Sequence, residues 1–562
     1  MANAGTDFTC YVGEAVRLDG TASTGYIRES QSNGSASILW EMGDGSTAED
    51  ILRPAHAYMS AGTYTATLTV RNSSGASSSD SAIVRVMEIS ASQTRALTDT
   101  GNPETNRINL QAAIDAAAVD SRSSEIVVPA GFVANDPINL PPRSSSNYVT
   151  IRTSTDLPSN QRVTKADTAK LFKINARSAA VSAYNQAVNI TPDANYYRIV
   201  GVYIERSGEY KNDVIAVDTS QAARPSHIIF DRIVIDGNGT NTVRAYAPNG
   251  TYFSLLNSSI LDIKYPNTES KAIGQWSGNG PLVVVNNRLE AASINLLIGG
   301  ANVSSSTEIL DGLEFRSNYA WKSPDWVVAD GIGKGFAVKN LFELKCGLNV
   351  VVTGNIFENN YADGQSGEGI VLKSTDDNQW SEVGNIDFRN NKVLNARAGF
   401  SVVGVQSSLG NPTGAKANHI RFFNNYWLVR QDRGNLALTP DYFEVNHNTF
   451  EATGNVEAFV HFEATPVGYR APGLKLLNNI TNRATVGSIF SSFGEGLASL
   501  NAFYSSWDVR ANIFNGGLPS AYPTGNYFSS VSGQTGIDSR PVGVDSAALN
   551  AATSAAATGT IS

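Results

Sequence analysis

Two lysines, Lys345 and Lys373, lie 28 residues apart at the ends of short segments of alternating apolar residues. We expect segments 341–345 and 370–373 to be strands, and the alternation directs Glu343, Lys345 and Lys373 outward. A lysine amine can abstract the proton next to a uronate carboxyl, and two carboxylates can hydrolyse a glycosidic bond. Glu343, Lys345 and Lys373 are therefore the candidate catalytic residues.

Residues 320–380 add aromatic, amide and charged side chains around these three. Ring faces suit the apolar faces of sugars, and charged groups suit hydroxyls and uronates. The candidate substrate-binding residues are Trp321, Trp326, Lys339, Tyr361, Gln365, Glu368 and Trp380. Calcium prefers oxygen ligands, so Asp363, Asp376 and Asp377 are candidate ligands for a calcium ion, the one cofactor we consider.

Two observations keep a non-catalytic role open. The sequence has neither an Asp-Asp cluster followed by Gly-His-Gly nor an Arg-x-Pro-x-x-Arg run, the motifs diagnostic of hydrolases and lyases on this kind of scaffold. Lysines and glutamates one repeat apart could equally form a salt-bridged ladder that keeps a sheet soluble. The pattern therefore locates a candidate site without fixing its reaction.

The element that must position these residues is a loose repeat of short strands separated by turns. The aligned turn positions are Gly201, Asp231, Ser258, Asn287, Asn318, Asn355, Asn391, Asn425, Asn448, Asn479 and Asn512. The shortest spacing, Asn425 to Asn448, is 23 residues, and the longest, Asn318 to Asn355, is 37. Such a repeat with little helix predicts a right-handed parallel β-helix with three sheets per turn. Asparagine tolerates left-handed backbone angles, and stacked asparagines can hydrogen-bond along the axis.

This repeat, together with a helix expected at 109–119 just before it, resembles the pectin/pectate lyase-like superfamily over roughly residues 105–540. Segments 270–276, 339–345 and 354–361 also resemble a group of uncharacterised bacterial β-helix proteins. The resemblance implies the fold and an extracellular setting, but no particular reaction.

The N-terminal segment has a different character. Alternating strands surround the run Trp40-Glu41-Met42-Gly43-Asp44-Gly45, followed by His56-Ala57-Tyr58 and Gly62-Thr63-Tyr64. These motifs resemble the PKD domain, an Ig-like β-sandwich. The resemblance implies a spacer or a protein- or glycan-contact module, in which Asp44 and His56 are structural.

The expected organisation is therefore all-β. A PKD-like sandwich occupies residues 1–90 and a linker 91–105. The β-helix follows at 106–545, entered through an amphipathic helix that carries Ile108, Leu110 and Ile114 on one face and covers its open end. The Ala- and Ser-rich residues 546–562 are expected to be a tail or a cap.

Composition limits the partners. The formal net charge of -9 opposes binding to nucleic acid, and no apolar run is long enough for membrane insertion. No leader pattern is present, so the numbering starts at a trimmed chain or export uses another signal. Two cysteines in 562 residues mean that disulfides do not hold the fold together.

Two functions follow. The first is an extracellular or cell-surface protein that binds a polysaccharide or cell-surface glycan and acts as a polysaccharide lyase or glycoside hydrolase. The second is a non-catalytic bacterial surface protein, an adhesin or a filament subunit that self-associates.

Overall fold

The structure is a computed structural model. It describes residues 1–561 other than 31–35, 178–185, 209, 218, 220–222, 267, 302–304, 328–334, 366, 375–379, 405–415, 431–434, 455–457, 464–468, 483–484, 516–517 and 529–542.

Residues 1–87 form a β-sandwich. Its larger sheet has the strand order β1-β7-β6-β3-β4, and β2 pairs with β5 in a second, antiparallel sheet. Buried and exposed residues alternate along β3 and β6, so that Trp40 and Leu68 lie in the core. The strands are β1 (Phe8–Tyr11), β2 (Val16–Arg17), β3 (Ile38–Glu41), β4 (Thr47–Glu49), β5 (Ala55–His56), β6 (Gly62–Arg71) and β7 (Ser77–Met87).

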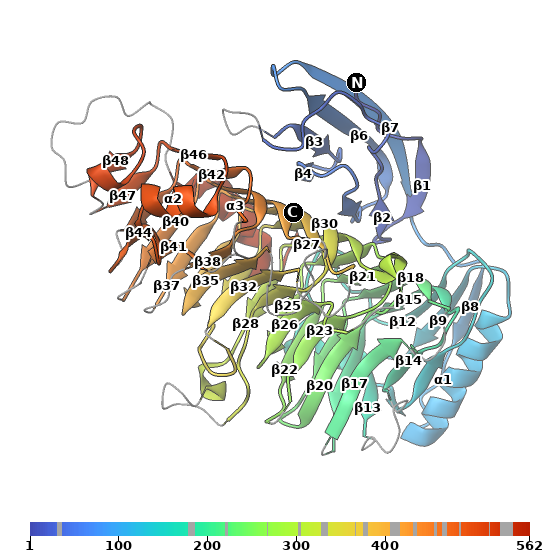
Figure 1. Cartoon of the computed structure of the whole chain (residues 1–562). Helices are drawn as coiled ribbons and strands as arrows, with labels where there is room; N and C mark the ends of the chain where they lie inside the picture. The colour runs from blue at the N-terminus through green and yellow to red at the C-terminus, as the bar shows by residue number, and fades with distance from the viewer. Residues whose placement is uncertain are drawn as a thin grey trace.

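The rest of the chain winds into a right-handed parallel β-helix with three long sheets (Figure 1). Each turn contributes one strand to each sheet, and we call the sheets I, II and III in the order in which the chain visits them. Three sheets per turn were expected from the repeat length, and the prediction is confirmed.

Sheet I comprises β8 (Gln93–Ala96), β9 (Ser124–Val128), β12 (Val149–Thr153), β15 (Asn195–Val200), β18 (Ser226–Asp231), β21 (Thr251–Leu256), β24 (Leu282–Val285), β27 (Asp311–Arg316), β30 (Gly347–Thr353), β33 (Val383–Arg389), β36 (Asn418–Phe423), β39 (Asp441–Asn446), β42 (Leu474–Leu477) and β46 (Trp507–Arg510). Sheet II comprises β10 (Val133–Asn135), β13 (Phe172–Ala176), β16 (Val202–Arg206), β19 (Val234–Asp236), β22 (Ser259–Ile263), β25 (Arg288–Ala291), β28 (Tyr319–Trp321), β31 (Ile356–Glu358), β34 (Lys392–Ala396), β37 (Tyr426–Val429), β40 (Thr449–Ala452), β43 (Ile480–Asn482), β47 (Ile513–Asn515) and β48 (Tyr527–Phe528). Sheet III comprises β11 (Ile138–Leu140), β14 (Val188–Ile190), β17 (Tyr210–Val217), β20 (Asn241–Ala247), β23 (Lys271–Gln275), β26 (Ile294–Ile298), β29 (Phe342–Leu344), β32 (Glu368–Lys373), β35 (Ala398–Val403), β38 (Asn435–Leu438), β41 (Ala458–Phe462), β44 (Gly487–Ser491) and β45 (Gly494–Glu495).

A column of aromatic rings fills part of the interior. Phe315, Phe357, Phe388, Trp427 and Phe450 stack with ring centroids 5.3 to 5.9 Å apart. Phe315 and Phe388 come from sheet I, whereas Phe357, Trp427 and Phe450 come from sheet II, and only Trp427 and Phe450 are paired in register. The column therefore packs sheets I and II against each other inside the solenoid.

Asparagines stack at the corner between sheets I and II. The side-chain oxygen of Asn355 accepts hydrogen bonds from the backbone N and Nδ2 of Asn318 at 2.8 and 3.2 Å. Its own Nδ2 donates to the carbonyl of Phe315 at 2.8 Å. The same pattern links Asn287, Asn318, Asn355, Asn391, Asn425, Asn448, Asn479 and Asn512. The predicted hydrogen bonding along the axis is confirmed.

The left-handed backbone at this corner belongs to the residue before each ladder asparagine. Asn286 has φ 58° and Asn390 has φ 55°. Neither Asn287 nor Asn391, both described in the structure, has a positive φ. The preceding residue makes the bend, which turns the ladder side chain inward to reach its neighbours. The expectation that the ladder residues themselves take left-handed angles is therefore wrong.

Helix α1 (Pro103–Ala118) covers the N-terminal end of the solenoid. It begins six residues before the expected start at 109, because Asn102 caps it by accepting from the N–H groups of Glu104 and Thr105 at 3.0 Å. Leu110 and Ile114 pack into the core, whereas Ile108, expected on the same face, is 53% exposed. The expected linker 91–105 contains strand β8, which pairs with β9.

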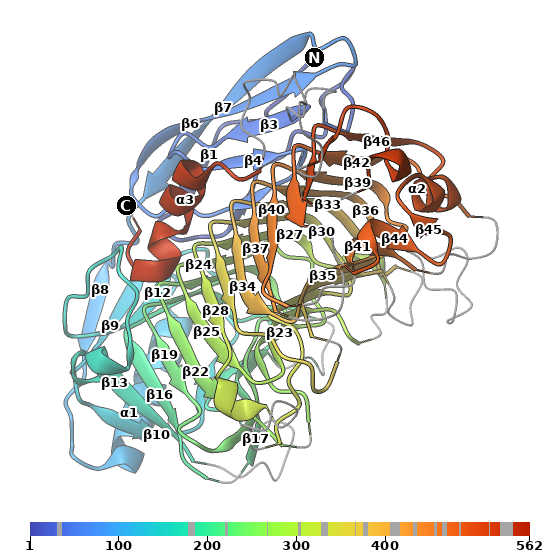
Figure 2. The ribbon, with the colours of Figure 1, turned by 90° about the vertical axis from the view of Figure 1, so that its left-hand side faces the viewer.

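The C-terminal residues return along the side of the solenoid. Helix α3 (Ser546–Thr558) lies beside sheet II (Figure 2), with Lys392 Nζ donating to Asn550 Oδ1 at 2.8 Å. Asp545 caps it and Gly559, at φ 76°, ends it. Residues expected to be a tail or a cap are thus a helix packed on the side of the molecule. At the far end, α2 (Leu497–Phe503) places Leu500 and Phe503 on the core.

The sandwich lies against the outward face of sheet I (Figures 1 and 2). Ala15 and Ala57 of the sandwich pack with Ile229, Leu256 and Val283 of sheet I. The interface also contains buried ion pairs, so the two parts are joined by more than the connecting segment.

Candidate functional site

Sheet III carries most of the predicted catalytic residues. Strand register places Gly274, Leu297, Glu343, Val371 and Ser401 in one outward row along this sheet. Glu343 is therefore on the outward side, as expected from alternation. It is only 1% exposed, however, and its Oε2 accepts a hydrogen bond from Asn340 Nδ2 at 2.8 Å. Glu343 is thus a buried carboxylate, although it was expected to face solvent.

The two predicted lysines remain partly exposed. Lys345 directly follows β29 and Lys373 ends β32, and the register of these strands places the lysines one rung apart. Gly300 leaves room beside Lys345: a side-chain carbon on Gly300 would lie 3.7 Å from Lys345 Nζ. The structure thus brings Lys345 and Lys373 together, as the spacing predicts.

A second group of charges lies at the start of β23, on the rungs before Glu343. Lys271 Nζ lies 3.2 Å from the carbonyl oxygen of Glu269 and 3.4 Å from its carboxylate. The ammonium of Lys339 pairs with the other carboxylate oxygen of Glu269. Glu269 thus holds two lysines from segments far apart in sequence, and one of them, Lys339, was a predicted substrate-binding residue.

Burial lowers the pKa of Lys271, and the positive charge of Arg244 adds to this effect, whereas Glu269 opposes it. Its side chain is 12% exposed. Burial alone would raise the pKa of Glu269, but the hydrogen bond from Lys339 and the charge of Lys271 hold that pKa low. Lys271 therefore loses its proton more readily than an exposed lysine does, and the neutral amine is the form that can take up a proton.

Arg244 flanks Lys271 on the neighbouring strand β20, with the two residues paired in register. Its Nη2 donates to Asp213 Oδ2 at 3.1 Å, and its guanidinium lies 4.4 Å from the ring centre of Trp276. The side chains of Arg244 and Lys271 both pass close to Gly274. A β-carbon at Gly274 would lie 3.0 Å from the side chain of Arg244 and 3.2 Å from that of Lys271. We call Asp213, Arg244, Glu269, Lys271, Trp276 and Lys339 the sheet III cluster.

The predicted aromatic residues separate into different places. Trp326 and Tyr361 are buried, with Ala292, Val327 and Val338, in a small apolar cluster. The guanidinium of Arg430 lies 4.4 Å from the ring centre of Tyr361. Trp321 lies on sheet II, where it remains partly exposed. Of these three rings, only that of Trp321 remains partly exposed.

The remaining predicted residues border sheet III. Glu368 begins β32 and is buried, Gln365 and Trp380 are partly exposed, and Asp363 is exposed. Asp376 and Asp377 lie outside the described residues. In the described part of the chain, no group of three or more His, Cys, Asp or Glu side chains could hold a metal ion. The calcium site therefore stays a prediction.

Sequence reasoning missed Lys271, Arg244 and Trp276. Lys271 and Trp276 lie in segment 270–276, which entered only as part of a resemblance, and Arg244 was not singled out. The signal that could have found them is the 27-residue spacing of Arg244 and Lys271, close to the interval between Lys345 and Lys373. The pairing partner Glu269 precedes the strand, so alternation within strands could not identify it.

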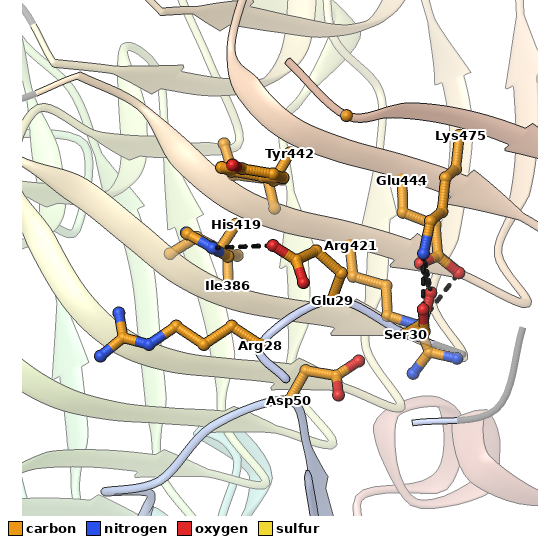
Figure 3. A pocket seen from close by; sticks show the side chains of 12 residues that line it. Arg28, Glu29, Ser30, Asp50, Ile386, His419, Arg421, Tyr442, Glu444 and Lys475 are labelled. Atoms are coloured by element: carbon orange, nitrogen blue, oxygen red, sulfur yellow. Dashed lines mark hydrogen bonds and ion pairs between the residues drawn. The ribbon is translucent and has the colours of Figure 1, made fainter. Parts of the chain in front are cut away.

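A small cavity lies between the sandwich and sheet I (Figure 3). It measures about 30 Å³ and is lined by Arg28, Glu29 and Asp50 from one side and His419, Arg421 and Tyr442 from the other. That volume suits a water molecule and not a sugar. Beside it, Arg421 pairs with Glu49 of the sandwich, and Lys475 Nζ donates to the carbonyl of Ser30 at 2.5 Å. These charges join the two domains.

Residues 1–87 match the family model of the PKD domain and form such a domain. No curated protein matches the chain. In the described residues, no helix has the length and apolar character needed to cross a membrane.

Several solved structures are similar over most of the chain. A mannuronic acid-specific family 6 polysaccharide lyase from human gut microbiota shares 10% identity at a TM-score of 0.46, covering 81% of this chain and 92% of that one. The family 28 exopolygalacturonase of Yersinia enterocolitica shares 9% at 0.36, covering 94% and 97%. The A-module of a mannuronan C-5 epimerase from Azotobacter vinelandii shares 10% at 0.40, covering 75% and 96%. Likenesses at this level concern the β-helix fold alone.

Proposed function

We propose that this chain is an extracellular or cell-surface protein that binds a uronate-containing polysaccharide on sheet III and cleaves it by elimination. The observation that carries the proposal is the position of Lys271, a desolvated lysine between Glu269 and Arg244, whose guanidinium lies over the ring of Trp276. Lys339, Lys345 and Lys373 extend the positive charge along the same sheet. A row of cations suits a polymer with a carboxylate on each sugar.

The chemistry follows from these groups. The neutral amine of Lys271 takes the proton from C5 of a uronate, and the electrons of that bond form a C4–C5 double bond. The bond from C4 to the glycosidic oxygen breaks, and that oxygen takes a proton from water. Arg244 and Lys339 lie beside Lys271, where a cation stabilises the negative charge that develops on the uronate carboxylate.

Lys271→Met tests this assignment, because methionine keeps most of the volume and removes the amine. The purified chain is incubated with polygalacturonate, polymannuronate, polyguluronate and neutral xylan, with and without calcium. Unsaturated uronate is followed by its ultraviolet absorbance, and new reducing ends are counted. We expect product from at least one uronate polymer and a loss of at least about a hundredfold in Lys271→Met.

Lys170→Met is the matched control, because Lys170 is an exposed lysine paired with Asp167 on a different face. It should keep full activity. Loss of activity in Lys345→Ala or Glu343→Ala but not in Lys271→Met would move the catalytic base to the originally predicted residues. No product from the unmodified chain on any polymer would contradict cleavage and favour the non-catalytic adhesin or filament role. Assembly detected by light scattering would then support that role.

A further inference from the structure

A groove of about 540 Å³ opens on sheet II, away from the sheet III cluster. Its floor consists of the outward side of β19, β22 and β25, and one wall is formed by residues 164–166 at the start of the 3-10 helix Lys165–Lys170. The volume lies within the range of roughly 300–1,000 Å³ typical of sites for small ligands. The groove belongs neither to the candidate catalytic site nor to the domain interface.

The wall of this groove is held in place before any ligand arrives. Val163 N donates to the carbonyl of Asn257 at 3.0 Å, and Ser259 Oγ donates to the carbonyl of Val163 at 2.6 Å. Arg162, which is 7% exposed, donates to carbonyls of Asn286 at 2.9 Å and Ala556 at 3.3 Å. The wall is thereby fixed both to the sheet and to helix α3. A preformed site binds without the cost of ordering a loop.

Charges in the groove are paired and leave no excess of cations. Asp236 accepts from Lys165 at 2.6 Å, and Glu290 accepts from Arg288 Nε at 2.6 Å. The third carboxylate, Asp262, pairs with Lys264 at 2.5 Å. Burial raises the pKa of Glu290 against the opposing effect of Arg288. Carboxylates that accept hydrogen bonds suit sugar hydroxyls, whereas they repel a polymer that carries carboxylates of its own.

Aromatic rings continue the groove onto the next rung. Tyr319 pairs in register with Arg288, and Trp321 pairs with Glu290. The Arg288 guanidinium lies 5.3 Å from the ring centre of Tyr319 and 5.5 Å from that of Trp321. Both rings are partly exposed, about 4.8 Å along the axis from the groove floor. Such rings can stack against the apolar face of a sugar.

We propose that the sheet II groove is a second carbohydrate site, which binds a neutral oligosaccharide, with Asp262 and Glu290 accepting from sugar hydroxyls and Trp321 stacking on a ring. It is independent of the site on sheet III, which takes an anionic chain. The two sites together would let the protein hold a neutral polymer while acting on a uronate polymer, or hold neutral and acidic stretches of one polymer.

Isothermal titration with four neutral hexasaccharides tests this site: β-1,4-linked glucose, xylose and mannose, and α-1,4-linked glucose. Hexagalacturonate is the anionic comparison. We expect at least one neutral hexasaccharide to bind, and its affinity to fall at least about tenfold in Trp321→Ala and in Asp262→Asn. Trp321→Phe, which keeps a ring, should retain most of the affinity. Lys271→Met should leave neutral binding unchanged.

Three results would overturn the proposal. One is that none of the four neutral hexasaccharides binds. Another is that binding persists at full affinity in both Trp321→Ala and Asp262→Asn, with their folding verified by circular dichroism. The third is that Lys271→Met abolishes neutral binding, which would place the ligand on sheet III. Failure here leaves cleavage of uronate polymers on sheet III standing, and the reverse also holds, because the variants and ligands differ.

Discussion

At the scale of single residues, the neighbours of Lys271 set the protonation of its amine. Burial and Arg244 lower the pKa of Lys271, and Glu269 raises it again. A general base works only when it is deprotonated, so the activity should rise with pH as Lys271 loses its proton.

Glu269→Gln should therefore move the rising limb of the pH–rate profile to lower pH. The variant removes the negative charge that favours the protonated form of Lys271, and it keeps the size of the side chain. The measurement is kcat/KM on the active uronate polymer as a function of pH. Exposed Glu41→Gln is the control and should leave the profile in place. If the rising limb of the pH–rate profile is not shifted in Glu269→Gln, the result contradicts the role of Lys271 as base.

At the scale of elements, the repeat predicts the strands well because every turn of the solenoid places similar residue types at similar positions. The ladder asparagines, the inward alternation and the three sheets all follow from residue types at fixed offsets. Helix α3 could have been predicted from the sequence. Asp545 before an Ala-rich run and Gly559 after it are ordinary start and stop signals of a helix. The first turn of α1 was missed in the same way, since Asn102 and Pro103 mark it.

The candidate site was only partly predictable, for a physical reason. Lys345 and Lys373 sit at equivalent positions of neighbouring rungs, so spacing brings them together. Glu343 accepts a hydrogen bond from Asn340, and Trp326 and Tyr361 pack with Val338. These partners lie outside the strands, where alternation within strands does not report them. The pairing of Glu269 with Lys339, 70 residues away, likewise depends on where a long connection crosses the sheet.

Asn391→Ala tests the ladder. The change leaves the backbone N–H of Asn355 and the carbonyl of Val352 without partners in a buried corner. Each unsatisfied buried group costs about 1–3 kcal/mol, so we expect a loss of roughly 2–5 kcal/mol in the free energy of unfolding. Urea denaturation measures it. Asn109→Ala on the exposed side of α1 is the control and should change stability by less than about 0.5 kcal/mol. Equal effects of the two changes would show that the ladder does not stabilise the corner.

At the scale of the whole molecule, the sandwich is docked on the solenoid through buried charge. His56 is 1% exposed and lies between Glu314 of sheet I and Asp44 of the sandwich, at 2.9 Å from each. Burial opposes its charge, but the two carboxylates outweigh burial and raise the pKa of His56 to about 9. The docked state therefore holds a proton that an exposed histidine releases near pH 6.5.

Docking should consequently weaken as the pH rises. Because the folded-state pKa exceeds the unfolded value, the stabilisation is complete below about pH 6.5 and is lost progressively up to about pH 9. The expected loss is roughly 3 kcal/mol. The midpoint of thermal unfolding, measured from pH 6 to 9.5, should fall over this window. His56→Gln should be less stable at pH 6 and should flatten the dependence; an unchanged slope in this variant would assign the effect to another group.

We propose that an anionic polysaccharide binds to the outward face of sheet III. The most direct test of this claim is a crystal structure of the Lys271→Met variant, which should bind without cleaving, soaked with the uronate oligosaccharide that the assay identifies. We predict density for the sugar across β20, β23 and β26, with a carboxylate beside Arg244 or Lys339. Density for the uronate chain only in the sheet II groove, or only on the sandwich, would contradict the claim.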